Sequence, residues 1–119
     1  MSRLRKDLGK WGEDLAVAFL RRRGFEVIDR NFFTTQGEID IVARLGGDYY
    51  FVEVKTRREA ELATDLAISR TKVHRLGKTV GSYCYRRGIT DASLILAGII
   101  IFVSAKTKTA KIRFAVIRS

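Results

Sequence analysis

The chain has 119 residues, of which 46% are hydrophobic, and carries a formal net charge of +10 at pH 7. This length suits one domain spanning residues 1–119, and the hydrophobic content excludes a wholly disordered chain. A strong positive field attracts polyanions, and nucleic acid is the commonest polyanion. No segment pairs a basic face with a bulky exposed apolar face, so we expect a nucleic-acid partner and no membrane partner.

The cysteine content and apolar runs bear on the compartment. Cys84 is the single cysteine, which permits no intramolecular disulfide and suggests a reducing compartment. The N-terminal segment lacks the apolar core of a signal peptide. The longest apolar run, Leu94 to Val103, has about half the length of a membrane span and predicts a buried strand. We therefore expect a cytoplasmic protein.

The first third of the chain predicts a helix and then a short strand. Helical spacing of apolar residues indicates a helix from about Arg5 to Arg23, with Gly24 as its stop. The apolar stripe of this helix consists of Leu8, Trp11, Leu15, Phe19 and Leu20. Residues 25–28 then predict a strand, and residues 31–37 a polar connection.

The remainder predicts four strands and a second helix. Strands at 37–43 and 48–56 flank a hairpin turn that contains Gly46 and Gly47. A helix fits residues 65–87, with an apolar stripe of Val73, Leu76, Val80, Tyr83 and Cys84. Strands at 94–103 and 111–117 follow. The order α-β-β-β-α-β-β indicates an α/β domain whose mixed sheet is flanked by helices.

Three of the charged residues inside the two strands that form the hairpin are candidates for a functional site. Asp40 lies in the first strand, and Glu53 and Lys55 lie in the second. Because side chains alternate, Glu38 and Asp40 should share one face, opposite Ile39 and Ile41. If the hairpin pairs regularly, Asp40 faces Glu53. The repulsion between these two carboxylates would be removed by a metal ion or by Lys55.

The residue types in this cluster suit metal-dependent phosphodiester cleavage. Carboxylate oxygens of Asp40 and Glu53 are ligands that Mg²⁺ accepts, and the Val54 carbonyl is a further candidate. Lys55 can orient or deprotonate a water, or neutralise charge on the phosphorane. Glu13 is a candidate second metal ligand or water-orienting group on the first helix.

Structural alternatives exist for the same residues. The Asp40–Glu53–Lys55 trio can also be an ion-pair network on an exposed sheet face, and Glu13 can form a salt bridge with Lys10. Glu38 can be an auxiliary ligand or an ion-pair partner of Arg44 or Lys55.

Several segments resemble the YraN-like family of predicted endonucleases, which belongs to the PD-(D/E)XK (restriction-endonuclease-like) superfamily and is distantly similar to archaeal Holliday-junction resolvases. The resemblance is dense over residues 9–57 and is carried by Gly12-Glu13, Gly24-Phe25, Arg30-Asn31, Gly37-Glu38-Ile39-Asp40 and Phe51-Val52-Glu53-Val54-Lys55-Thr56-Arg57. Residues 58–64 and 92–98 depart from the common pattern of that family.

The resemblance implies a catalytic set of Asp40, Glu53, Lys55 and Glu13. In it, Asp40, Glu53 and Glu13 would bind Mg²⁺ or Mn²⁺. It further implies endonuclease action on DNA, including branched or damaged DNA.

Candidate phosphate-binding residues flank this set: Lys10, Arg57, Arg58, Lys72 and Arg75. No base-reading module is evident, so we expect no strong sequence specificity. Two other hypotheses about function fit the sequence. The protein can be a non-catalytic nucleic-acid-binding protein with this fold, or an assembly protein that associates through its apolar C-terminal strands. A homodimer is compatible with the nuclease reading.

Overall fold

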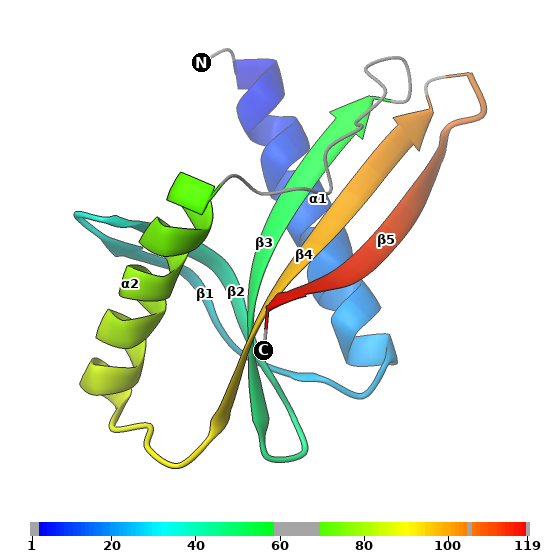
Figure 1. Ribbon diagram of the computed structural model, residues 1–119. Helices are drawn as coiled ribbons and strands as arrows, with labels where there is room; N and C mark the ends of the chain where they lie inside the picture. The colour runs from blue at the N-terminus through cyan, green and yellow to red at the C-terminus, as the bar shows by residue number, and fades with distance from the viewer. Residues whose placement is uncertain (1–2, 59–69, 105, 119) are drawn as a thin grey trace.

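A five-stranded sheet with one helix on each side forms the fold (Figure 1). The structure, a computed structural model, describes residues 3–58, 70–104 and 106–118. Its elements are α1 (Arg3–Arg22), β1 (Glu26–Thr34), β2 (Gly37–Leu45), β3 (Asp48–Arg58), α2 (Arg70–Arg87), β4 (Ser93–Ser104) and β5 (Thr109–Arg118). This order and the mixed α/β class confirm the prediction.

The spatial order of the strands follows the chain, β1-β2-β3-β4-β5. The strands β1, β2 and β3 pair antiparallel, as do β4 and β5. The central pair, β3 and β4, is parallel and therefore needs a crossover, which contains α2.

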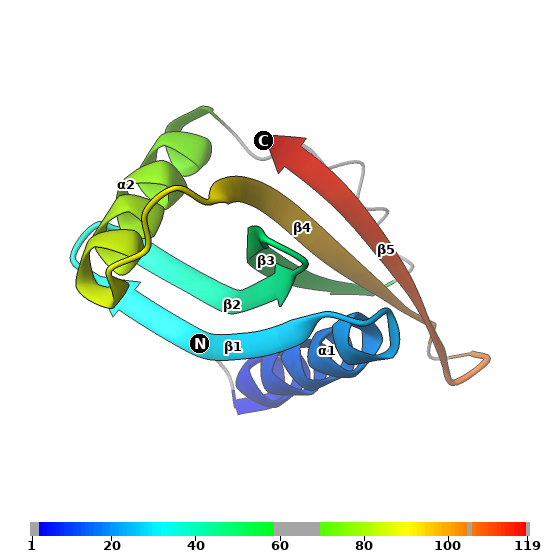
Figure 2. The same ribbon diagram turned by 90° about the horizontal axis from the view of Figure 1, so that it is seen from below.

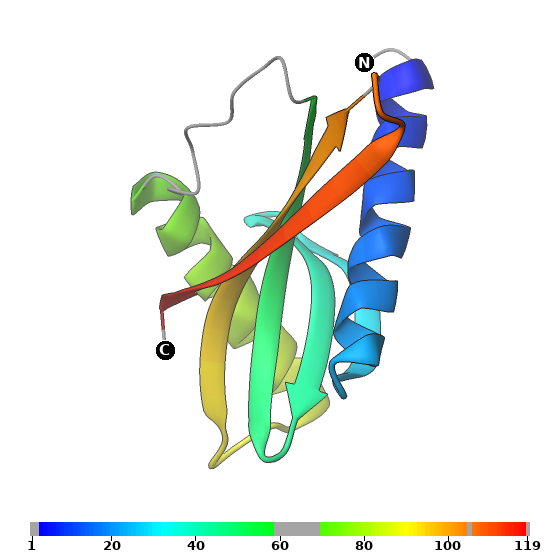
Figure 3. The same ribbon diagram turned by 90° about the vertical axis from the view of Figure 1, so that its right-hand side faces the viewer.

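The two helices cover opposite faces of the twisted sheet (Figures 2 and 3). On the α1 face, Ala16 and Leu20 pack with Ile41, Val52 and Ile99. On the α2 face, the core contains Leu76 and Tyr83 of the helix together with Ile39 and Phe51 of the sheet. Apolar residues of β3 alternate between these two cores as expected, and Cys84 is a buried free thiol.

Two details of the prediction are wrong. Residues 31–34 belong to β1, because Phe32 pairs with Ile39 and Thr34 with Gly37. The two strands form a hairpin whose turn is confined to residues 35 and 36, and this cross-strand pairing overrides the turn preference of the polar segment. Trp11 is 41% exposed. The contact line of α1 passes through Gly12, Ala16 and Leu20, and Trp11 lies one residue off this line.

The helix predicted over residues 65–87 is present from Arg70, and residues 65–69 lie outside the described part of the chain. No helix in the described ranges has both the length and the apolar character needed to cross a bilayer.

Candidate active site

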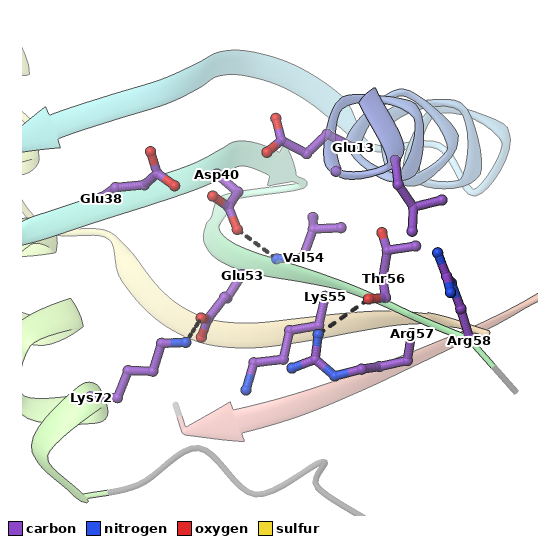
Figure 4. A pocket seen from close by; sticks show the side chains of 12 residues that line it. Glu13, Glu38, Asp40, Glu53, Val54, Lys55, Thr56, Arg57, Arg58 and Lys72 are labelled. Carbon is purple, nitrogen blue, oxygen red and sulfur yellow. Dashed lines mark hydrogen bonds and ion pairs between the residues drawn. The ribbon is translucent and has the colours of Figure 1, made fainter. Parts of the chain in front are cut away.

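A pocket of about 740 Å³ opens where α1, β2, β3 and the start of α2 meet (Figure 4). Eight charged residues of the described ranges line it: Glu13, Glu38, Asp40, Glu53, Lys55, Arg57, Arg58 and Lys72. The pocket therefore gathers all four residues of the predicted catalytic set, although they come from a helix and two different strands.

The position of Asp40 follows from a separation of β2 and β3. Their pairing ends at Ile41–Val52, whereas β2 remains paired with β1 as far as Gly37. In the gap, a carboxylate oxygen of Asp40 accepts a hydrogen bond of 2.7 Å from the backbone N–H of Val54. The expected ladder pair of Asp40 with Glu53 is therefore absent from the pairing. The Asp40 side chain therefore takes the place of the β2 backbone carbonyl that would otherwise accept the hydrogen bond from Val54.

The same separation breaks the alternation that the sequence predicts for β2. Ile41 packs in the core under α1, whereas Ile39 packs in the core under α2. The prediction that these two residues share a face is wrong, because a regular pleat does not continue through Asp40. Figure 4 shows the Asp40 side chain directed toward β3 at this point.

Asp40 is only 7% exposed, and its burial raises the pKa of its carboxyl to about 8. The hydrogen bond from Val54 opposes this rise, while the neighbouring acids Glu38 and Glu13 reinforce it. A carboxyl with this pKa is largely protonated at neutral pH when no cation is nearby. A bound cation would favour the ionised form.

Glu13 extends from α1 toward the same space (Figure 4). Burial, and then the charge of Glu38, raise the pKa of Glu13, while Arg30 and Asn31 of β1 lower it. The Arg30 Nη2 atom lies 3.9 Å from Glu13 Oε1 and 2.8 Å from Asp14 Oδ1. The ion-pair partner of Glu13 is thus Arg30, and the predicted salt bridge with Lys10 is wrong for the described residues.

A close approach between α1 and β3 sets the position of Glu13 at the pocket. A Cβ atom added at Gly12 would overlap Thr56 Oγ1 and lie 3.2 Å from Thr56 Cβ. The absence of a side chain at Gly12 therefore lets the helix backbone rest on β3, one residue away from Lys55.

Glu53 and Lys55 lie on the strand opposite Asp40. The Glu53 side chain is 17% exposed and forms an ion pair with Lys72 of α2. Arg57 donates a hydrogen bond of 3.1 Å from Nη1 to the carbonyl of Thr56. Of the predicted phosphate-binding residues, Arg57, Arg58 and Lys72 line the pocket, whereas Lys10 and Arg75 are exposed outside its lining.

The donor chemistry of the pocket fits a hard divalent cation that keeps most of its water. Within the described ranges, no three Asp, Glu, His or Cys side chains are already grouped at ligand spacing. Mg²⁺ does not need such a cage, because it commonly uses one or two carboxylates and several waters. Asp40 and Glu53, or Asp40 and Glu13, can supply that number from one pocket.

Arg30 and Asn31 belong to the site, although the sequence predicts no role for them there. They were expected at the edge of a polar connection, whereas they lie inside β1 beside Glu13. Arg30 Nε is buried without a hydrogen-bond partner in the described structure, whereas its Nη2 atom contacts Glu13 and Asp14. The strand predicted over residues 25–28 ends before Arg30 and Asn31, so the sequence does not mark either of them as a residue inside a strand.

Comparison with known proteins gives a consistent assignment. The family model described as "Uncharacterised protein family UPF0102" matches residues 12–118. A UPF0102 protein of Geobacter sulfurreducens is 45% identical over 89 residues, which cover 74% of this chain and 70% of the relative. A UPF0102 protein of Helicobacter hepaticus is 40% identical over 92 residues, covering 77% and 82% of the two chains. These matches confirm the predicted family and name no activity.

Proposed function

The chain belongs to the uncharacterised protein family UPF0102, and we propose that it is a metal-dependent endonuclease that hydrolyses phosphodiester bonds in DNA. One observation carries this proposal. A nearly buried carboxyl, Asp40, shares a pocket with Glu13, Glu53 and Lys55, in a protein whose net charge is +10. Such a pocket suits a cation between the protein and a polyanion.

The alternatives for a buried acid cluster are neutralisation by protons, by basic side chains or by a metal ion. Asp40 and Glu13 both have raised pKa values, so the basic residues nearby do not compensate them fully. A bound Mg²⁺ or Mn²⁺ would polarise the scissile phosphate and lower the pKa of a coordinated water. Nuclease membership of the PD-(D/E)XK type is part of the same proposal.

The residues of the chain have distinct roles in this proposal. Asp40 and Glu53 hold the cation, and the hydrogen bond from Val54 orients the Asp40 carboxyl. Glu13 orients water from the helix side, and Lys55 neutralises charge that develops on the phosphate. Arg57 and Arg58 at the pocket edge contact flanking phosphates and carry no sequence information.

Cleavage assays with Mg²⁺ or Mn²⁺ test the proposal on duplex, flap, four-way-junction and single-stranded DNA. We expect the full chain to cut at least one of these substrates. Asp40→Asn and Lys55→Ala should each lower the rate by at least about 100-fold, because each removes charge stabilisation of the transition state. Lys78→Ala, which changes an exposed residue outside the pocket, should cut normally. No cleavage of any substrate with either metal would refute the proposal.

The ion pair between Glu53 and Lys72 favours a second candidate, a non-catalytic nucleic-acid-binding protein. In that case Lys72 permanently neutralises the negative charge of Glu53, and no metal cation is required. Binding to DNA should then be the same with EDTA and with Mn²⁺, and Asp40→Asn should not alter it in either condition. A metal-dependent difference between the wild type and Asp40→Asn would exclude this candidate.

A further inference from the structure

The α2 face of the sheet continues past the pocket onto β4 and β5. The register aligns Arg57 of β3 with Phe102 of β4, and Phe102 with Lys111 of β5. One step along, Ile100 of β4 pairs with Arg113 of β5. Since Ile112 and Phe114 pack in the core under α1, the alternating Lys111 and Arg113 belong to the opposite face, the one that carries Glu53 and Lys55.

The charge of this region is of one sign. Residues 92–119 contain five lysines and arginines and no aspartate or glutamate. Lys111 and Arg113 are exposed, and no described carboxylate lies within ion-pair distance of either. Among the described residues, these cations therefore have no counter-charge, and they are available to an external anion.

A second hollow lies at the far end of the same face. Its volume is about 270 Å³, and it is lined by Phe102, Ser104, Thr107, Thr109 and Lys111. Phe102 is half-buried and contacts no described aromatic ring or guanidinium group. The hollow thus combines a free aromatic ring, hydroxyl groups and a lysine, which are the groups that bind a base and its phosphate.

We propose that Arg57, Phe102, Lys111 and Arg113, here called the strand platform, bind an unpaired nucleic-acid strand. This strand would extend from the candidate active-site pocket that contains Asp40 and Glu53. The cations contact successive phosphates, and Phe102 stacks on a base held in the second hollow. This assignment rests on the proposed function only in naming DNA as the ligand. It assigns the substrate a direction, from β3 across β4 to β5.

An unpaired strand fits this surface better than a duplex. A base inside a duplex is stacked on both sides and cannot enter a hollow in the protein surface without being flipped out. A single strand presents its bases freely, and stacking on aromatic side chains accepts every base. The strand platform therefore favours substrates with a single-stranded arm, without selecting a sequence.

Fluorescence anisotropy in EDTA tests the strand platform independently of catalysis, using the full chain, a labelled blunt duplex and the same duplex with a single-stranded arm. Phe102→Leu should weaken binding to the armed DNA about tenfold, because it removes base stacking, and leave the blunt duplex unchanged. Phe102→Tyr keeps the ring and should bind the armed DNA normally. Lys111→Gln with Arg113→Gln should lower the salt slope for the armed DNA by about 1.4.

The matched control is Arg21→Gln with Arg22→Gln, which removes two exposed cations from the end of α1 on the other face of the sheet. Equal losses in this control and in the Lys111/Arg113 variant would overturn the proposal. So would equal effects of Phe102→Leu on both DNAs, or no effect on either, in variants whose melting temperatures show them to be folded. Binding that follows the prediction in a chain that cuts no DNA would refute the nuclease proposal and leave the strand platform standing.

Discussion

At the residue scale, Asp40 combines a position suited to a ligand with a cost to stability. Its carboxyl is nearly buried, and its neighbours Glu38 and Glu13 are acidic. A residue selected only for stability would not be placed there, because an apolar or amide side chain would avoid the desolvation penalty. This desolvation cost is consistent with a carboxyl group whose role is to bind a cation.

The stability of the metal-free protein should therefore depend on Asp40 in a pH-dependent way. The pKa of Asp40 is about 8 in the folded chain, against 3.8 as its ordinary value. Between these values the unfolded chain has lost the proton that the folded chain keeps, so the free energy of unfolding falls as pH rises from about 4 to 8. Asp40→Asn keeps an acceptor for the Val54 N–H and removes this loss.

Urea unfolding in EDTA should show Asp40→Asn more stable than the wild type at pH 7.5, by about 1–3 kcal/mol, and close to it at pH 4.5. Asp91→Asn removes a charge from an exposed side chain that forms no ion pair with a described residue, and it is the control. An equal gain at both pH values would contradict the assigned pKa.

The identity of the candidate residues was accessible from sequence, while their geometry was not. Asp40, Glu53 and Lys55 stood out because charged residues are rare in strands that are otherwise apolar. The role of Arg30 beside Glu13 depends on how far β1 extends, which its hairpin pairing with β2 determines. Such pairing leaves no periodic signal in a single segment.

At the element scale, the separation of β2 from β3 creates the site. Both strands and their hairpin were predicted from alternation and the Gly46-Gly47 turn, and both are present. A regular ladder would have satisfied the Val54 N–H with a backbone carbonyl and put Asp40 opposite Glu53. The departure at Asp40 cannot be inferred from periodicity, because it depends on Ile39 and Ile41 entering different cores.

The packing of α1 on β3 gives a prediction at this scale. Gly12→Ala should lower the free energy of unfolding by about 1–3 kcal/mol, because the new methyl group overlaps Thr56. Gly77→Ala in α2, where nothing lies within 4 Å of the added atom, should instead be neutral or stabilising by up to about 1 kcal/mol. Chemical denaturation of both variants makes the comparison.

A second arm of the same experiment uses Thr56→Ala. Removing the Thr56 hydroxyl should restore part of the stability lost in Gly12→Ala, so the double variant should be less destabilised than the two single changes predict. Equal stability of Gly12→Ala and Gly77→Ala would show that α1 does not rest on β3 as the structure describes.

At the scale of the whole molecule, the carboxylates of the pocket lie in a strongly basic chain. The 23 lysines and arginines outnumber the 13 aspartates and glutamates, and residues 92–119 carry basic charge alone. The overall field should bring DNA to the surface, while the carboxylates act only over short distances because salt screens exposed charges beyond about 10 Å.

This division predicts binding that depends on salt and not on base sequence. In EDTA, the logarithm of the association constant should fall linearly with the logarithm of salt concentration, since each phosphate contact releases a condensed counterion. Two duplexes of equal length and unrelated sequence should give the same slope and affinities within about threefold, because phosphate contacts carry no sequence information. Anisotropy titrations at several salt concentrations measure both quantities. An affinity difference of about 100-fold between the duplexes would instead require base contacts, and would place a specificity determinant on a surface that now has none assigned.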